Sequence, residues 1–362
     1  MRLRLEPRTE TARWLVFATP LLAAALTLMC GIVLFAALGY DPGRALASFF
    51  VKPIDSVYGL TELALKATPL LLCALGLAVG YRGNVWNIGA EGQLVVGAIA
   101  AGGLALAFHG EEPIWLLPAM VVAGAAGGAA WAAIPAFLRV RFHANEILTS
   151  LMLTYVALHL LGFLVHGPWQ NPQGYNFPQS REFGDAAILP LLMEGTRLHV
   201  GSLLALLAVP AAWLLLDKSY LGFQIRVAGL APGAAAYAGF PTGRIVWAGF
   251  IAGGAMAGLA GMFEAAGPIG KLQPVISPGY GFAAIIVAFL GRLNAFGILL
   301  ASLLVALLYL GGETAQIDLK LPPAVTGVFQ GLLLFFLLGS DFLARYRLRV
   351  VRRGSAPASI GV

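Results

Sequence analysis

The sequence predicts an all-α, polytopic integral membrane protein with about ten transmembrane segments. Its 362 residues are 59% hydrophobic and only 11% charged, whereas soluble domains carry about 25% charged residues. The mean hydropathy is +0.83, and long uncharged runs recur along the chain. The 45 glycines favour close contact between helices, because small residues let the backbones of transmembrane helices approach each other.

The uncharged runs place the expected helices in order. The first run, 14–39, follows a group of arginines and exceeds the apolar region of about 7–15 residues found in a cleavable signal peptide. The run 280–291 is too short to cross a bilayer at about 1.5 Å per residue, so we expect a half-helix or a re-entrant segment there. The other expected spans are 62–81, 88–108, 113–137, 146–166, 199–216, 244–266, 294–312 and 322–340.

Lysine and arginine residues orient these spans, because the loops that carry them stay on the cytoplasmic side of a membrane. We expect a cytoplasmic N-terminal segment, 1–13, a cytoplasmic segment, 217–243, and a cytoplasmic basic tail, 341–362. The loop 167–198 then faces outside. One transmembrane domain, 14–340, remains, since no loop is long enough to form a soluble domain. The net charge of +6 follows from this distribution and does not indicate nucleic-acid binding.

The segment 82–93, RGNVWNIGAEGQ, interrupts the apolar runs with charged, amide and glycine residues. Such side chains need partners or water at membrane depth, and glycine lets the backbone turn sharply or approach another helix. A second polar break follows at 291–297. For Glu91, bridging two helix ends is an alternative to lining a pore. The candidates for lining or gating a pore are Asn84, Asn87, Glu91, Gln93, Arg292 and Asn294.

Patterns typical of catalysis and metal binding are missing from the sequence. A phosphate-binding loop needs glycine five residues before a Gly-Lys-Ser/Thr sequence. Around Lys271 the corresponding positions are Ala265 and Leu272. The histidines do not have the spacing of a zinc-binding helix, and Cys30 and Cys73 lie in apolar runs typical of buried free thiols. We therefore expect a transport subunit that has no catalytic residues, metal or cofactor and hydrolyses no ATP itself.

The segment 222–240 lies between two spans on the predicted cytoplasmic side. Pro232 suits the first turn of a helix, where no backbone N–H is needed, and Gly239 suits its end. A short helix of small residues with one aromatic side chain can dock into a groove of another protein. A plain surface connector is the alternative.

Residues 229–240 resemble the coupling loop of type II ABC importer permeases, whose pattern is close to G-x-N-P-x-A-A-x-Y-A-G-I. Ala231 stands where that family usually has Asn, and the missing N-cap should weaken the first helical turn by about 1 kcal/mol. Residues 82–93, 145–157 and 291–297 similarly resemble segments of nucleoside-type permeases. The resemblance implies that the short helix docks into an ATPase subunit, and the matching positions are Gly229, Pro232, Ala235, Tyr237 and Gly239.

The resemblance implies one half of the translocation pathway of an ABC importer for nucleosides or related purines, in the bacterial inner membrane, with both termini cytoplasmic. It also implies three kinds of partner: a second, non-identical permease, two ATP-binding subunits or a fused one, and an extracytoplasmic substrate-binding lipoprotein. ATP and Mg would bind to the ATPase subunits. A simple-sugar ABC permease is one alternative. An ion-driven secondary transporter, with Glu91 or Glu264 carrying the coupling ion, is another.

Overall fold

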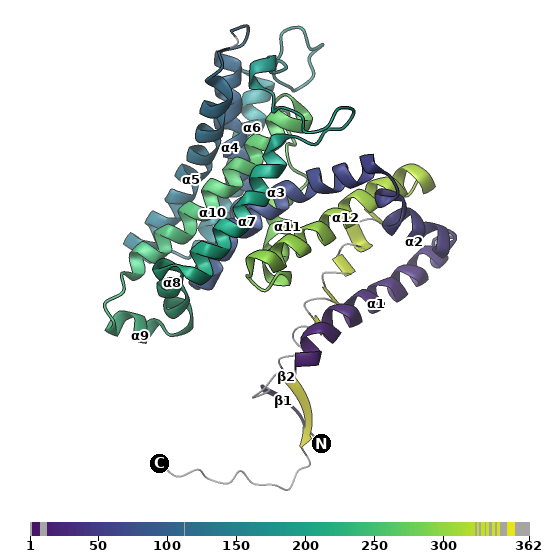
Figure 1. Cartoon of the computed structure of the whole chain (residues 1–362), viewed down its shortest axis with the longest axis vertical. Helices are drawn as coiled ribbons and strands as arrows, with labels where there is room; N and C mark the ends of the chain where they lie inside the picture. Colours follow the sequence, from purple (N-terminus) through teal and green to yellow (C-terminus); the bar gives the residue numbers. More distant parts are fainter. Residues whose placement is uncertain are drawn as a thin grey trace. The chain divides into compact units, whose positions relative to one another are not determined.

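The computed structural model describes residues 2–7, 13–111, 113–322 and 346–351, and also 324–340 without 326, 330, 333, 334, 337 and 338. It divides into two compact units. The smaller unit contains Met1–Lys52 and Gly311–Val362, and the larger contains Pro53–Leu310. The all-α expectation holds for the larger unit, whose named elements are helices (Figure 1).

The smaller unit joins the two ends of the chain in an antiparallel ribbon, β1 (Arg2–Pro7) with β2 (Tyr346–Val351). This ribbon departs from the all-helical expectation. Arginine alternates with apolar residues in both strands, and this period of two is the pattern of a strand. The smaller unit also contains the helices α1 (Arg13–Ala37) and α2 (Pro42–Phe50).

The larger unit is a helical bundle, and α12 contributes to both units. Two of its helices end in a π-helical turn, η3 and η4. The elements that follow α2 are η1 (Lys52–Ile54), α3 (Val57–Arg82), α4 (Ala90–Ala107), α5 (Leu116–Phe142), α6 (Glu146–His166), η2 (Asp185–Ala187), α7 (Val200–Trp213), η3 (Leu214–Lys218), α8 (Tyr220–Leu230), α9 (Pro232–Tyr237), α10 (Thr242–Glu264), η4 (Ala265–Ile269), α11 (Tyr280–Leu290) and α12 (Ala295–Leu319).

Within the described residues, seven helices are long and apolar enough to cross a membrane: α3, α4, α5, α6, α7 with η3, α10 with η4, and α12. Seven of the ten expected segments therefore correspond to such helices. Tyr280–Leu290, which is α11, is a shorter apolar helix, and Ala25–Ala37 is an apolar part of α1. The last expected span, 322–340, lies partly outside the described residues. The chain is a multi-pass membrane protein.

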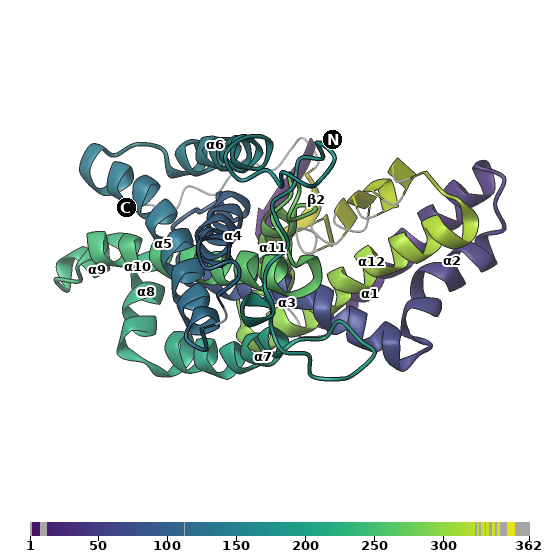
Figure 2. The ribbon, with the colours of Figure 1, turned by 90° about the horizontal axis from the view of Figure 1, so that it is seen from above.

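Helix α10 packs against α3, α4 and α5, and Figure 2 shows α4 with α5 and α6 beside it. The contacts use glycine. A methyl group on Gly258 would overlap the carbonyl oxygen of Gly124, and one on Gly261 would overlap the carbonyl oxygen of Leu94. Such close approach of transmembrane helices requires small residues. The abundance of glycine in the sequence predicts this packing.

The two ends of the bundle differ in charge. One end, called the basic end here, carries Arg82, Arg139 and Arg226 together with α8 and α9. The loop that follows α6 lies at the other end, called the loop end (Figure 1). Because loops that carry lysine and arginine stay in the cytoplasm, the basic end is the end that the sequence predicts to be cytoplasmic.

Two crossings of the bundle are helical over only part of their length. Residues 84–89 have no helical structure and run back from the basic end. Asn87 approaches Gly253 of α10, which packs beside Gly76 of α3. Gly76 precedes Arg82 by about 9 Å along the helix axis, at about 1.5 Å per residue. Helix α4 therefore begins inside the bundle.

The second broken crossing is irregular from 271 to 279 and helical only from α11 onward. Helix α11 has 11 residues, which confirms the expected half-helix. A methyl group on Gly281 would overlap the backbone of Glu91, so the first turns of α4 and α11 meet inside the bundle. Helices α4 and α11 start from this meeting point and run to opposite ends of the bundle.

Candidate functional site

The Glu91 carboxylate holds the start of α11. Its Oε2 atom accepts a hydrogen bond of 2.7 Å from the Gly281 N–H, and the side chain is buried, with 3% exposure. The Ser277 hydroxyl accepts hydrogen bonds from the Gly279 and Tyr280 N–H groups, at 3.1 and 2.8 Å. The first N–H groups of a helix have no partner within the helix and favour a negative charge. Glu91 therefore bridges two helix ends, the alternative that the sequence left open.

The Arg82 guanidinium holds the other end of α11. Its Nε donates to the Leu293 carbonyl at 2.9 Å, in the turn after α11. Its Nη1 donates to the Leu216 carbonyl at 3.1 Å and to Asp217 Oδ1 at 2.7 Å, and Nη2 donates to Asp217 Oδ2 at 3.3 Å. A cation suits carbonyl groups beyond a helix C-terminus, and the two bonds to one carboxylate fix the guanidinium plane.

Asn87 and Gln93 bind each other. Asn87 Nδ2 donates to Gln93 Oε1 at 2.9 Å, and Gln93 Nε2 donates to Asn87 Oδ1 at 3.0 Å. The Tyr81 hydroxyl donates to the Asn87 carbonyl at 2.9 Å. Each amide side chain is only 1% exposed. The pair fastens the extended segment 84–89 to the first turn of α4, and neither side chain faces open space in this conformation.

Asn84 lies in the turn after α3, with a φ of 55°. Its side-chain oxygen accepts a hydrogen bond of 2.9 Å from Trp86 Nε1. The Trp86 ring stacks on Phe289 of α11, with 5.7 Å between the ring centroids, and lies 5.4 Å from Tyr81. Trp86 is 36% exposed. Trp86 was not among the predicted site residues, although it lies within the polar segment 82–93.

Arg292 and Asn294 lie in the turn between α11 and α12. Arg292 and Leu293 have φ values of 53° and 54°, a left-handed conformation that non-glycine residues rarely adopt. The Asn294 side chain accepts hydrogen bonds from the Phe296 and Gly297 N–H groups, at 3.1 and 3.3 Å, so it caps α12. Arg292 is exposed. The structure therefore places both candidates at the basic end of the bundle.

The segment that resembles a coupling loop forms α8 and α9. Pro232 is the first residue of α9, Ala231 provides no side-chain cap, and Gly239 adopts a φ of 74°. Ala235 is buried, whereas Tyr237 is 97% exposed. Pro232 and Gly239 are also exposed, and Tyr237 is the large side chain of the predicted set that is available to another protein.

Gly229 has a different position from the other coupling candidates. A methyl group at Gly229 would overlap the Arg82 carbonyl oxygen, so α8 packs directly on the end of α3. Asp217, which precedes α8, binds Arg82 at 2.7 Å and Arg226 at 2.8 Å. Asp217 was not among the predicted site residues. Its signal is that it is the one acidic residue in the segment 217–243, whose other charged residues are Lys218 and Arg226.

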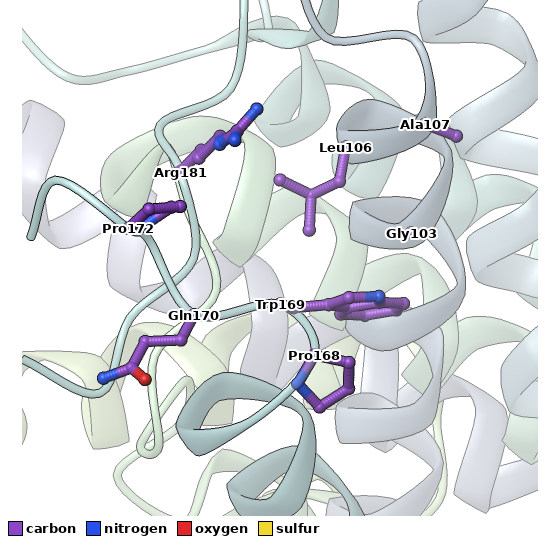
Figure 3. Close-up of a pocket in the computed structure, with 8 residues that line it drawn as sticks. All are labelled: Gly103, Leu106, Ala107, Pro168, Trp169, Gln170, Pro172 and Arg181. Carbon is purple, nitrogen blue, oxygen red and sulfur yellow. The ribbon is translucent and has the colours of Figure 1, made fainter. Parts of the chain in front are cut away.

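The loop end contains a cavity of about 330 Å³ between the end of α4 and the loop after α6 (Figure 3). The Trp169 ring lies against Gly103 of α4. The Arg181 guanidinium makes no hydrogen bond or ion pair with the residues that the structure describes. The cavity is lined by Gly103, Leu106, Ala107, Pro168, Trp169, Gln170, Pro172 and Arg181.

The loop beside this cavity is hydrogen-bonded to the second broken crossing. Ser180 N–H donates to the Leu272 carbonyl at 2.8 Å, and Leu272 N–H donates to Ser180 Oγ at 2.9 Å. Phe183 N–H donates to the Gly270 carbonyl at 2.8 Å. The loop and the irregular segment before α11 therefore form one hydrogen-bonded structure.

Two titratable groups stabilise the loop end. His199 caps α7, since its Nδ1 accepts the Gly201 N–H at 3.1 Å. Burial lowers the pKa of His199 to about 4. Arg197 forms an ion pair with Glu62 of α3, with 3.0 Å between Nε and Oε1, and this hydrogen-bonded carboxylate raises the pKa of Arg197. In the part of the chain that the structure describes, no group of three His, Cys, Asp or Glu residues could hold a metal ion.

Comparison with known proteins gives one family. The family described as "Branched-chain amino acid transport system / permease component" matches residues 59–338. A glucose ABC transporter permease protein of Haloferax volcanii is 40% identical over 99% of this chain and 97% of its own length. No solved structure matches the chain.

Several relatives are named for nucleosides. A guanosine ABC transporter permease protein of Bacillus subtilis is 32% identical over 93% of this chain and 97% of its own length. A nucleoside ABC transporter permease protein of Lactococcus lactis is 29% identical over 88% of this chain and 89% of its own length. A second guanosine permease protein of Bacillus subtilis is 28% identical over 66% of this chain and 76% of its own length.

Proposed function

Because the chain belongs to the branched-chain amino acid transport system permease family, a family of ABC importer permeases, we propose that it forms half of the translocation pathway of an importer for nucleosides or related purines. The observation that carries this proposal is the α8–α9 segment. It presents an exposed Tyr237 at the basic end and packs on the end of α3 beside the segment 82–93. The nucleoside cargo is supported by the guanosine permease relative and by the resemblance of residues 82–93 and 145–157 to nucleoside-type permeases.

Simple sugars are the second candidate cargo, and a specific observation favours them. The glucose permease relative is 40% identical and aligns over nearly the whole of both chains. In both cases the fold and the energy source are the same, and only the contacts with the cargo differ.

Transport would proceed by alternating access. Separate ATPase subunits would bind ATP with Mg and close against each other, and α9 would carry this motion to the bundle. A bound nucleotide can drive the change only if it binds one conformation more tightly than the other. The pathway would run between this permease and a second, non-identical one. The two guanosine permease proteins of Bacillus subtilis support such a pair.

The proposed location is the bacterial inner membrane, with both termini and the basic end in the cytoplasm. An extracytoplasmic substrate-binding lipoprotein would then deliver cargo at the loop end. The Arg181 guanidinium, beside a cavity of about 330 Å³, is a candidate contact for an acidic side chain of that protein.

The cargo is tested by a ligand screen of the cognate binding protein, followed by uptake into proteoliposomes that contain the complete transporter. We expect guanosine or a related nucleoside to bind and to be taken up only when ATP is supplied. Binding of glucose with no binding of nucleosides would replace the proposed cargo by the second candidate.

An ion-driven secondary transporter remains the contrasting class. It would use Glu91 or Glu264 to carry the coupling ion. Glu91 is engaged with the Gly281 N–H, which supports a structural role for its charge. Uptake driven by a proton or sodium gradient in vesicles that contain no ATPase would overturn the ABC assignment of the energy source.

A further inference from the structure

We propose that Arg82 and Asp217 are positioning residues that make half-helix α11 move together with the α8–α9 segment. The proposal rests on the proposed function, because it names the residues that carry motion from the ATPase side into the bundle. Three steps of contact support it, all within the larger unit.

The first step joins α8 to the end of α3. Gly229 leaves room for the Arg82 carbonyl oxygen to touch the α8 backbone. Only Ala231 separates the last residue of α8 from the first residue of α9. A displacement of α9 therefore reaches Arg82 through backbone contacts, which deform less than contacts between exposed side chains.

The second step joins Arg82 to two other parts of the chain. The guanidinium uses Nε for Leu293 and both Nη atoms for Asp217. Asp217 also binds Arg226 of α8 at 2.8 Å. The Arg82 and Asp217 side chains are 12% and 21% exposed, so water screens their interaction less than it screens a surface pair. Arg226 is 51% exposed and contributes less.

The third step passes through α11 itself. Its C-terminal end is bound by Arg82 through Leu293, and its N-terminal end is bound by Glu91 through Gly281. A short helix held at both ends moves as one body. Phe289, on this helix, stacks on Trp86 at 5.7 Å, and Phe282 is 36% exposed. Motion of α11 therefore shifts aromatic side chains near both of its ends, Phe282 near its start and Phe289 near its C-terminus.

In this arrangement the segment 82–93 has one function, which is to hold α11 at both ends. Its arginine and its glutamate bind opposite ends of the same half-helix, and the amide pair between Asn87 and Gln93 fastens the intervening chain to the first turn of α4. The segment 82–93 thus holds both ends of α11, and Asp217 connects this segment to α8 through its ion pairs with Arg82 and Arg226.

The test compares Asp217→Asn, Arg82→Lys and the double variant in the complete transporter, reconstituted with its second permease, ATPase subunits and binding protein. The readout is the number of ATP molecules hydrolysed per cargo molecule taken up. We expect each single variant to raise this ratio about fivefold, in the range of measured coupling effects. The double variant should raise it by less than the product of the two, since the residues act through one interaction.

Glu62→Gln is the matched control, because Glu62 also forms an ion pair with an arginine but lies at the loop end. It should leave the ratio unchanged. A second readout follows a spin label at position 282, introduced as Phe282→Cys with Cys30→Ser and Cys73→Ala. In the parent transporter we expect its spectrum to change when ATP is trapped with vanadate, and this change should be lost in Asp217→Asn.

The proposal is overturned if Asp217→Asn keeps the parent ratio and the parent spectral change. If Arg82→Lys does not accumulate, Asp217→Asn decides the question, because it removes the charge while keeping the side-chain shape. Failure of the proposed function has a different signature. In that case the parent permease itself would not co-purify with an ATPase or would take up cargo without ATP.

Discussion

Arg82 and Glu91 lie at opposite ends of the same half-helix. Arg82 donates to the Leu293 carbonyl in the turn after α11 at 2.9 Å, and Glu91 accepts the Gly281 N–H in its first turn at 2.7 Å. The cation faces the carbonyl end and the anion faces the amide end, the arrangement that the dipole of a helix favours. One short polar segment thus supplies both charges.

Glu91→Gln should destabilise the permease moderately. The amide keeps the acceptor for Gly281 N–H but loses the charge, at a cost of about 1 kcal/mol. Glu91→Ala also leaves the Gly281 N–H without its acceptor, which adds about 1–3 kcal/mol. Thermal unfolding of the purified permease in detergent should rank the midpoints as parent, then Gln, then Ala. Equal midpoints for the two variants would show that the hydrogen bond is not needed.

Gly258→Ala should disrupt the contact between α5 and α10. Its methyl group would overlap the Gly124 carbonyl oxygen, and overpacking of this kind costs about 1–3 kcal/mol. Gly162→Ala on α6 is the control, because nothing lies within 4 Å of the added methyl group. Thermal unfolding should separate the two variants, and a Gly258→Ala midpoint equal to that of the parent would contradict the close packing.

Tyr237→Asp should separate ATP hydrolysis from transport. The side chain is 97% exposed on α9, and docking of α9 into an ATPase subunit would bury it. Burying a carboxylate there costs free energy that burying the aromatic ring does not. We expect the variant to insert normally while uptake falls at least about tenfold, equivalent to 1.4 kcal/mol of lost coupling. Tyr237→Phe, which keeps the ring, is the control. Uptake unchanged in Tyr237→Asp, with normal ATPase association, would exclude the docking role.

Stability should fall on the acid side because of His199. Burial lowers its pKa from 6.5 to about 4 in the folded protein. Between these two pH values the unfolded chain binds a proton that the folded chain does not, so acid favours unfolding. Stability from this group is complete above about pH 6.5 and is lost as the pH falls toward 4.

His199→Asn should flatten this dependence, since the asparagine side chain can still accept the helix N–H but does not titrate. His166→Asn provides the control, because His166 is exposed. Melting curves between pH 7.5 and 4.5 should lose their acid slope in His199→Asn alone. A slope that survives in that variant would assign the acid sensitivity to other groups.

The membrane-spanning character and most helix positions could be predicted from the sequence. Uncharged runs identify the segments that cross the bilayer, because an unpaired charge there is too costly. Pro232 and Gly239 carry the local backbone preferences that begin and end α9. The ribbon of β1 and β2 was not predicted, although arginine and apolar residues alternate in both segments of the sequence.

The candidate site was predicted as a set of polar residues, and the tertiary structure decided their partners. The sequence by itself determined that Arg82, Asn87, Glu91 and Gln93 need partners or water wherever they lie at membrane depth. It could not name Asp217 or Leu293, which are 135 and 211 positions from Arg82. Helices buried on nearly all sides have no single apolar face to reveal their neighbours. The pairing of distant segments therefore depends on how glycine contacts bring the helices together, which only the folded structure fixes.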